Sequence, residues 1–170
     1  MIILSLGSNL SSKFGNRKDN LKLAISLLES GGIIIVKKSS VYETPSYPDK
    51  TKPKFLNILI SVETDFLPEE LMRVLLHVEK KLERKRKVKN EPRTCDIDII
   101  DYHGQLINIK KEKFHLIIPH KNLSSRIFVL IPLQEILPNW KHPKTKEMVT
   151  TLIQKLPNEE RKSILKIKKD

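Results

Sequence analysis

The order in which two apolar periodicities alternate along this chain constrains its fold more than any other feature. Runs of apolar and β-branched residues, typical of strands, alternate with segments whose apolar residues recur at the spacing of one helix face. Gly31-Gly32 ends the first helical segment and Pro68 begins the second. The predicted strands span 2–6, 33–42, 55–64 and 95–102, and the predicted helices span 19–30 and 68 to the basic stretch that starts at 84.

This β-α-β-β-α-β order predicts an α+β fold of the ferredoxin-like arrangement: an antiparallel sheet, helices packed on one of its faces, and a C-terminal extension. A chain of 170 residues suits one domain, so we expect a single domain over 1–170 with a basic, solvated tail from about 157 to 170. We also expect 106–107 to pair back after a turn, an apolar run over 125–136 to lead into a helical turn, and a last helix over 148–156.

The chain is strongly basic, with a formal net charge of +12 and an isoelectric point near 9.8. This charge favours a polyanionic partner: a nucleic acid, an acidic membrane surface or a phosphorylated small molecule. No apolar run approaches the roughly 18 residues of a membrane-spanning helix, so we expect no membrane contact. We interpret Met1 to Leu6 as a strand rather than a signal peptide, and the single Cys95 excludes an internal disulfide framework. We therefore expect a cytoplasmic location.

The most informative segment is Pro92-Arg93-Thr94-Cys95-Asp96-Ile97-Asp98-Ile99-Ile100. On a strand, Asp96 and Asp98 lie on one face, about 6.6 Å apart along the chain, and the apolar residues lie on the other. Aspartate is depleted in strands, so two at alternate positions need a reason. The simplest alternative is a face that is merely wet. We favour a metal site, because a site with few carboxylates suits Mg²⁺ that takes its other ligands from water and phosphate.

Phosphates bound near this strand would have to be held by side chains. None of the 5 glycines forms a G-x-x-x-x-G-K-[ST] or G-x-G-x-x-G loop. Arg84, Arg86, Lys89 and Arg93 stand immediately before the acidic pair. A basic loop that leads into two carboxylates fits a complex of Mg²⁺ with a nucleoside triphosphate.

Six short motifs in order carry a resemblance to a known family. They are Gly7-Ser8-Asn9-Leu10, Tyr42-Glu43-Thr44-Pro45, Phe55-Leu56-Asn57, Pro92-Arg93-Thr94-Cys95-Asp96-Ile97-Asp98, Pro119-His120 and Arg126-Ile127-Phe128. The series resembles the 6-hydroxymethyl-7,8-dihydropterin pyrophosphokinase family from about Ile3 to about Pro138, and P-R-T-x-D-x-D is its most specific segment. The family's fold is the ferredoxin-like one.

The resemblance implies a reaction in folate biosynthesis. ATP would donate its β,γ-pyrophosphoryl group to the hydroxymethyl oxygen of the pterin, with attack at the β-phosphorus and release of AMP. The family implies two Mg²⁺ ions on Asp96 and Asp98, with Arg84 and Arg93 stabilising charge on the migrating group. It also implies a monomer whose partners are ATP and 6-hydroxymethyl-7,8-dihydropterin.

The remaining site residues follow from the resemblance alone. The ATP side would use Glu79, Arg84, Arg86, Lys89, Arg93, Ile99, His120 and Arg126. The pterin side would use Thr44, Pro45, Tyr47, Phe55, Asn57 and Phe128, with the two phenylalanines sandwiching the ring. Without the family, core packing would explain Phe55 and Phe128, a turn cap would explain His120, and solvation would explain Glu79.

The chain also departs from the family pattern. Lys89-Asn90-Glu91 stands where Arg, an aromatic residue and Gly are frequent, so we expect a looser closed state. Lys121 stands where tyrosine is common. Three loops, 11–17, 44–54 and 84–92, lack apolar periodicity, and we expect them to close over ATP and exclude water.

Two other functions stay open at this point. A nucleic-acid-binding module would fit the charge and the fold, although no RNP-like strand is present and an acidic pair would repel phosphates without metal. A regulatory sensor would bind the pterin without turnover, and the presence of Arg93, Asp96 and Asp98 argues against it.

Overall fold

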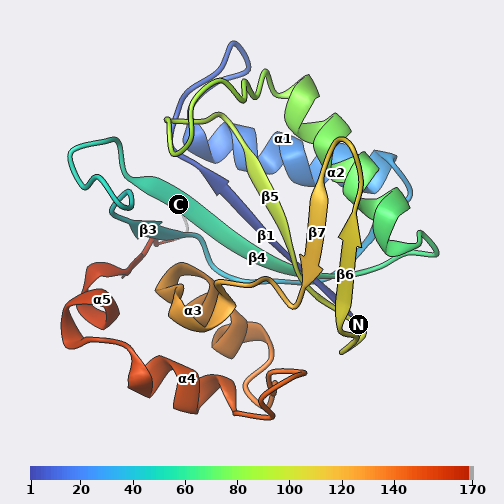
Figure 1. Ribbon diagram of the computed structural model, residues 1–170. Helices are drawn as coiled ribbons and strands as arrows, with labels where there is room; N and C mark the ends of the chain where they lie inside the picture. Colours follow the sequence, from blue (N-terminus) through green and yellow to red (C-terminus); the bar gives the residue numbers. More distant parts are fainter. Residues whose placement is uncertain (169–170) are drawn as a thin grey trace.

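A six-stranded antiparallel sheet forms the centre of the molecule in the computed structural model, which describes residues 1–168 (Figure 1). The strands run in the order β5-β1-β4-β3-β8, and β2 pairs with β4 beside β3. Their bounds are β1 Ile2–Ser8, β2 Ile34–Lys38, β3 Tyr42–Thr44, β4 Phe55–Glu63, β5 Asp96–Tyr102 and β8 Leu165–Lys166. A mixed fold with an antiparallel sheet is thus confirmed.

Helices cover both faces of this sheet, so the expectation of helices on one face is wrong (Figure 1). Helices α1 (Arg17–Ser30) and α2 (Pro68–Lys81) lie on one face. Helices α3 (Ile127–Ile136) and α4 (Val149–Lys155) lie on the other. The second layer forms because the sequence of α3 is apolar all round, and such a helix has to be buried.

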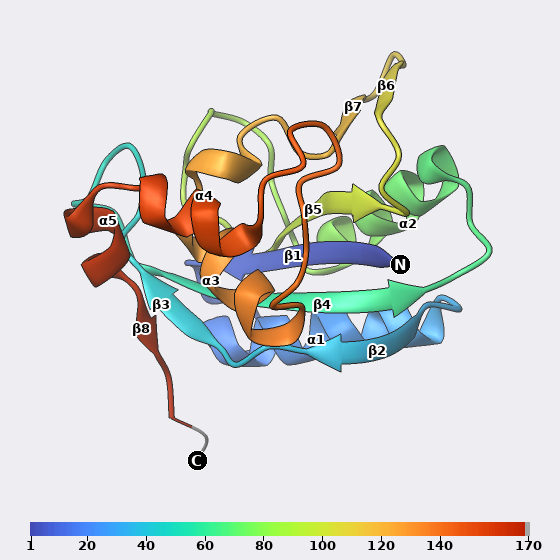
Figure 2. The same cartoon turned by 90° about the horizontal axis from the view of Figure 1, so that it is seen from below.

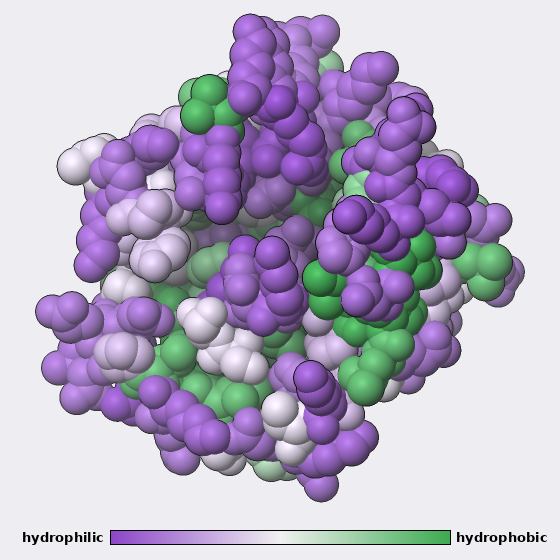
Figure 3. Space-filling model, in the orientation of Figure 1, coloured by the Kyte–Doolittle hydropathy of each residue, from purple (hydrophilic) through white to green (hydrophobic). Residues whose placement is uncertain are grey.

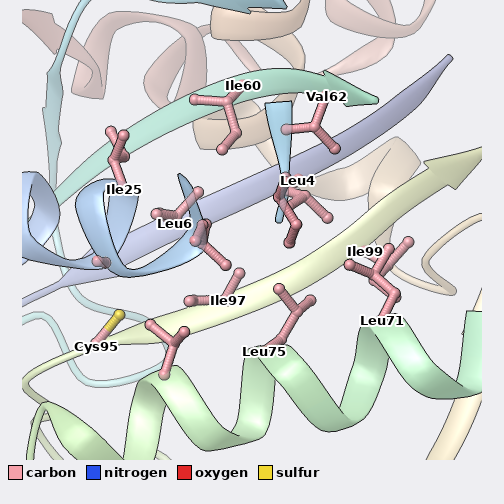
Figure 4. Packing of buried hydrophobic residues seen from close by; sticks show 14 of the residues in the cluster. Leu4, Leu6, Ile25, Ile60, Val62, Leu71, Leu75, Cys95, Ile97 and Ile99 are labelled. Atoms are coloured by element: carbon pink, nitrogen blue, oxygen red, sulfur yellow. The ribbon is translucent and has the colours of Figure 1, made fainter. Parts of the chain in front are cut away.

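Alternation along the strands divides the apolar side chains between two cores. Leu4 and Leu6 point into the core under α1 and α2, together with Ile97 and Ile99 (Figure 4). Ile3 points the other way, into the core under α3 and α4, which we call the α3/α4 core. Both faces of the central strands are therefore covered, as near-continuous apolar strands require.

Of the two helices of the first layer, α2 begins at the predicted Pro68, and α1 begins at Arg17, two residues before the predicted start at 19. Asn16 caps α1: its side chain accepts from the backbone N–H groups of Lys18 and Asp19, and the Asp19 carboxylate accepts from the Asn16 N–H. Pro68 opens α2 at a position that needs no N–H donor.

Two strand predictions are wrong. The single strand expected over 33–42 is divided into β2 and β3, because the Ser39 hydroxyl accepts from the Leu59 N–H in place of a backbone carbonyl. Residues 106–107 do not pair back with β5. Instead β6 (Ile107–Lys110) pairs with β7 (His115–Ile118). This hairpin projects from the sheet (Figure 2).

The C-terminal segment adds a helix and a strand to the fold, and its described basic residues are exposed, in keeping with the expectation of a solvated tail. Helix α5 (Asn158–Ser163) leads into β8, which pairs with β3 at the sheet edge. Residues 169–170 of the predicted tail lie outside the described residues. A short 3₁₀ turn, η1 (Leu123–Ser125), precedes α3. Within 1–168, no helix is long and apolar enough to cross a membrane.

Candidate active site

The face of the sheet under α3 changes from apolar to polar along its strands. Ile3, Leu59 and Ile100 lie in the α3/α4 core. Further along β1, the same face carries Ser5 and then Gly7. Ser5 pairs with Leu59 on β4 and with Asp98 on β5, and Gly7 pairs with Asn57 on β4 and with Asp96 on β5. The sheet thereby brings the acidic pair and Asn57 to one end of one face.

Asp96 and Asp98 lie on the face that the alternation predicts. Ile97 and Ile99, between and beyond them, are buried with exposed fractions of 2% and 3%. The carboxylate side chains keep 25% and 33% of their surface exposed. The predicted shared face of the two aspartates is therefore what the structure has.

Two arginines hold Asp96. Arg84 Nη2 lies 3.5 Å from one carboxylate oxygen, and Arg93 Nε lies 3.2 Å from the other. Arg84 also donates from Nη1 to the backbone carbonyl of Cys95, at 3.1 Å. Arg93 Nε meets Asp96 as an ion pair without hydrogen-bond geometry, and the buried Arg84 Nε has no hydrogen-bond partner among residues 1–168.

Asp98 is held by one arginine and faces a histidine. Arg126 donates from Nη1 to Oδ2 at 3.0 Å, and His120 Nε2 lies 3.8 Å from the same oxygen. Burial and the charge on Asp96 raise the pKa of Asp98 to about 6, although Arg126 opposes the shift. An additional cation beside Asp98 would stabilise its charged form and so oppose the rise in its pKa.

His120 presents a neutral donor to the site. Burial, with a contribution from Arg126, lowers the pKa of His120 to about 4, so the ring is uncharged near neutral pH. Its Nδ1 accepts from the backbone N–H of Asn122 at 3.1 Å, which places the ring proton on Nε2. The histidine thus caps a turn and also directs an N–H toward Asp98.

The basic loop and the acidic pair enclose a cavity of about 330 Å³. Its lining contains more cationic than anionic side chains, which suits a polyanion larger than one phosphate. The lining residues are Arg84, Lys85, Arg86, Lys87, Val88, Lys89, Asn90, Glu91, Arg93, Asp96, Asp98, His120 and Arg126.

Glu79 is buried, contrary to the solvated position that its helix suggested. Only 2% of its surface is exposed. One carboxylate oxygen accepts from the Ile97 N–H at 2.8 Å, and the other pairs with Arg86. Burial and the nearby Asp96 raise the pKa of Glu79. The side chain of Ile99 also lies in the core, so any contact of Ile99 with ATP would have to come from its backbone.

The predicted pterin residues gather beside Gly7. Asn57 donates from Nδ2 to Thr44 Oγ1 at 2.9 Å, and both side chains are buried. A Cβ atom on Gly7 would lie 3.2 Å from Asn57 Oδ1 and 3.5 Å from Phe55 Cδ1. Glycine at this position leaves room for the amide and the ring.

The rings of Phe55 and Phe128, predicted to sandwich the pterin, are partly exposed. An arginine of the acidic site lies over each ring. The Arg93 guanidinium lies 4.9 Å from the centroid of Phe55, and that of Arg126 lies 5.4 Å from the centroid of Phe128. Phe128 also packs partly against the α3/α4 core. Two further predicted residues lie in the loop after β3, where Pro45 is partly buried and Tyr47 is 80% exposed.

Asn9 is a site residue to which sequence reasoning assigned no role. It is buried, and its Oδ1 accepts from the Arg93 N–H at 2.7 Å. Its Nδ2 donates to the Pro53 carbonyl at 3.0 Å. Asn9 therefore joins the segment before the acidic pair to the loop after β3. The sequence feature that could have identified Asn9 is its place in the Gly7-Ser8-Asn9-Leu10 motif, just after a strand.

The three predicted loops lie against one another. Lys52 Nζ, in the loop 44–54, donates to the Asn90 carbonyl at 2.9 Å. Lys13 Nζ, in the loop 11–17, lies 3.4 Å from the Glu83 carboxylate at the start of the basic segment. Hydrophilic side chains cover most of the face seen in Figure 3, in agreement with the net charge.

The donor set fits a metal that is completed by a ligand. In the part of the chain that the structure describes, no group of three or more His, Cys, Asp and Glu could hold a metal ion. Asp96 and Asp98 offer carboxylate oxygens, which suit Mg²⁺ when phosphate oxygens and water supply the rest.

Comparisons with known proteins give a consistent assignment. The family model described as 7,8-dihydro-6-hydroxymethylpterin-pyrophosphokinase (HPPK) matches residues 3–138. A 2-amino-4-hydroxy-6-hydroxymethyldihydropteridine pyrophosphokinase of Bacillus subtilis is 37% identical over 134 residues, which cover 78% of this chain and 75% of that protein. The protein of the same name from Aquifex aeolicus is 38% identical over 142 residues, 84% of this chain and 83% of that protein.

Other relatives are much longer. The mitochondrial folate synthesis bifunctional protein of Arabidopsis thaliana is 38% identical over 136 residues, and the chain spans 80% of its own length but 23% of that relative. A crystal structure of Plasmodium falciparum HPPK-DHPS matches with a TM-score of 0.70 at 18% identity, over 91% of this chain and 44% of that one. At this identity the likeness shows the fold alone.

Proposed function

Because the chain belongs to the 7,8-dihydro-6-hydroxymethylpterin-pyrophosphokinase family, we propose that it transfers pyrophosphate from ATP to the hydroxymethyl group of 6-hydroxymethyl-7,8-dihydropterin. AMP and the pterin diphosphate are the products, and the step belongs to folate biosynthesis. The family is the one that the motif series predicted. The observation that carries the proposal is the acidic pair, with Arg84 and Arg93 on Asp96 and Arg126 on Asp98.

Asp96 and Asp98 hold magnesium together with the phosphates of ATP, and we propose two ions. Bound Mg²⁺ neutralises phosphate charge and orients the phosphoryl groups. Arg126 and His120 both lie beside Asp98 Oδ2, so they would contact phosphates that a metal on Asp98 brings there. His120 donates its Nε2–H without adding charge, since its pKa is lowered to about 4.

Arg84 and Arg93 stabilise the negative charge of the migrating pyrophosphoryl group. Both guanidinium groups line the cavity and contact the Asp96 carboxylate, so they lie beside the place where phosphates held by a metal on Asp96 would bind. Arg86 and Lys89, in the lining of the same cavity, bind the remaining phosphate charge. Glu79 acts through Arg86, whose guanidinium it holds at the cavity rim.

The pterin binds beside Gly7, against the polar edge that Asn57 and Thr44 form. Asn57 provides an acceptor and a donor to the ring, and its hydrogen bond with Thr44 fixes the orientation of its amide. Phe55 and Phe128 stack on the two faces of the ring. Pro45 and Tyr47 complete the pocket from the loop that follows β3.

Several features extend this proposal to the whole chain. The order β5-β1-β4 followed by β2 and β3 supports the ferredoxin-like topology, with α3 to α5 as an added layer. We propose one pyrophosphokinase domain over 1–170 and a monomer, which light scattering would test. The cytoplasmic location stays a prediction, since one relative is named as mitochondrial.

Release of AMP from ATP tests the proposed function directly. Purified protein is incubated with ATP, Mg²⁺ and 6-hydroxymethyl-7,8-dihydropterin, and matched reactions omit the pterin or include EDTA. We expect AMP that depends on both the pterin and the metal. Binding of ATP and pterin without AMP would favour the sensor. Binding of neither, with retention on RNA that weakens steeply with salt, would favour the nucleic-acid module.

A further inference from the structure

Glu135, on α3, collects hydrogen bonds from two other segments of the chain. Its carboxylate accepts from the Ser40 N–H at 2.9 Å, from the Ser40 hydroxyl at 2.7 Å and from the Tyr42 hydroxyl at 2.9 Å. Lys166 Nζ, on β8, adds a fourth contact at 3.1 Å. Burial, and then Glu135 itself, raise the pKa of Tyr42 to about 12, so the hydroxyl remains a donor at working pH.

These contacts join the two walls of the proposed pterin pocket. Helix α3 carries Phe128 two turns before Glu135. Strand β3 carries Tyr42, which pairs with Asn57, and Thr44, which accepts the Asn57 amide. One wall therefore holds a stacking ring and the other holds the polar edge.

Side chains make the polar joint between these walls. Lys37 Nζ, in β2, donates to the Ile136 carbonyl at 3.2 Å, and Glu135 makes the contacts to Ser40 and Tyr42. Hydrogen bonds to a charged acceptor are stronger than neutral ones, so the Glu135 cluster contributes more per bond than an ordinary surface contact.

The C-terminal segment completes the joint from beyond the family match, which ends at residue 138. Strand β8 pairs Lys166 with Tyr42 and Leu165 with Glu43, and the Ile167 N–H donates to the Val41 carbonyl at 2.8 Å. Strand β3 is thus held from outside by β8, and the Lys166 side chain reaches the same carboxylate as Tyr42.

We infer that Glu135 is a positioning residue for pterin binding, which fixes the separation between Phe128 on α3 and the Thr44–Asn57 edge on β3 and β4. The inference rests on the proposed function, because it needs the pterin to lie between these walls. Stacking and edge hydrogen bonds both depend on short, fixed separations, so a looser joint lowers affinity for the flat ring. The phosphate site keeps its own contacts, with Arg84 and Arg93 on Asp96 and Arg126 on Asp98, so we expect it to change less than the pterin pocket.

The test compares Glu135→Ala and Glu135→Gln with a matched control, Glu147→Gln. Glu135 and Glu147 side chains are each 28% exposed and each pairs with a lysine, but Glu147 lies just before α4. For each protein we would measure the melting temperature, the dissociation constant of the pterin by titration, and KM for both substrates with kcat.

We expect Glu135→Ala to weaken pterin binding and raise its KM about 10-fold, because the loosened walls then have to be ordered when the ring binds. KM for ATP and kcat should stay within about twofold, and Glu135→Gln should fall between Ala and wild type. Tyr42→Phe, which removes one donor and keeps the ring, should weaken pterin binding in the same direction by a smaller factor.

Two results would overturn the inference. One is unchanged pterin affinity in folded Glu135→Ala and Tyr42→Phe proteins; the other is an equal rise of both KM values, which would indicate a purely structural role. Absence of AMP formation by the wild type contradicts the proposed function instead. Because the titration needs no turnover, it separates these failures, and a wild type that binds no pterin overturns both.

Discussion

Arg126 donates to Asp98 across 3.0 Å and so joins the residue before α3 to the second carboxylate of β5. The pair links the helical layer on the α3 face to the proposed metal site. It also leaves Asp98 with a raised pKa of about 6, because burial and the charge on Asp96 outweigh the opposing effects of Arg126 and Arg93. The charged form of Asp98 therefore destabilises the folded state at neutral pH. A substitution at Asp98 can thus impair function and still stabilise the fold.

Replacement of Asp98 by Asn is expected to reduce AMP formation by roughly 10³-fold, because the second carboxylate for Mg²⁺ is lost. The thermal stability of the protein at neutral pH should rise, although its activity falls. A carboxyl whose folded pKa is raised from 3.8 to about 6 contributes its stability at low pH and loses it as the pH rises through 6. In EDTA, Asp98→Asn should therefore melt higher than wild type at pH 7, with the difference vanishing near pH 4.

Thermal melts at several pH values and AMP release together check this prediction. Asp65→Asn, at an exposed position before α2, is the matched control and should change neither quantity. Near-normal turnover by Asp98→Asn would remove the metal assignment, and a lower melting temperature at pH 7 would contradict the electrostatic argument.

Replacement of Arg93 by Ala should lower kcat by roughly 10²-fold and change KM for ATP by less than about threefold, since its guanidinium lines the cavity beside Asp96 and serves the migrating group. Arg93→Lys should recover part of the rate, because lysine restores charge but not the guanidinium fork. Steady-state kinetics with both substrates separates the effect on kcat from the effect on KM.

Arg73→Ala, on the outer face of α2, removes an arginine of comparable reach and is the control. A pure loss of affinity in Arg93→Ala, with kcat unchanged, would contradict the role in the transition state. Arg93 also lies over Phe55, so a small rise in the pterin KM is compatible with the prediction.

Local patterns were sufficient to predict the acidic pair. The side-chain period of a strand is two, so Asp96 and Asp98 had to share a face once 95–102 was assigned as a strand. The basic residues before them were also predictable, because Arg84 and Arg93 both lie in the connection between α2 and β5 that leads directly into the acidic pair.

The second helical layer and the burial of Glu79 could not be predicted in this way. The apolar sequence of α3 indicates that the helix is buried, but not against which face. Glu79 lies on a helix whose other acids are exposed, and only the approach of Ile97 and Arg86 gives its carboxylate partners. Such contacts depend on residues that are distant in sequence.

Gly7→Ala should weaken pterin binding about 10-fold and leave KM for ATP unchanged. The added Cβ would lie 3.2 Å from Asn57 Oδ1, which is tight, so the amide has to move away from the pterin edge. Gly31→Ala is a matched control, because its Cβ would lie 3.3 Å from two backbone oxygens at the end of α1. Equal affinity for the pterin in wild type and Gly7→Ala would contradict the placement of the pocket.

Replacement of Glu79 distinguishes a residue that positions Arg86 from one that contacts the nucleoside. Glu79→Ala leaves the Ile97 N–H buried without an acceptor, which costs on the order of 2 kcal/mol, and it frees Arg86. We expect a lower melting temperature and a rise of about 10-fold in KM for ATP.

Glu79→Gln can still accept from Ile97, so its melting temperature should stay closer to wild type while the Arg86 pair is lost. If Glu79 acts through Arg86, both variants raise KM for ATP and GTP by the same factor. If the Glu79 carboxylate instead contacts the nucleotide base, Glu79→Gln changes the ratio of the KM values for ATP and GTP. That result would show that the positioning role is wrong. Glu29→Gln, an exposed acid at the end of α1, shows how much of either effect comes from charge alone.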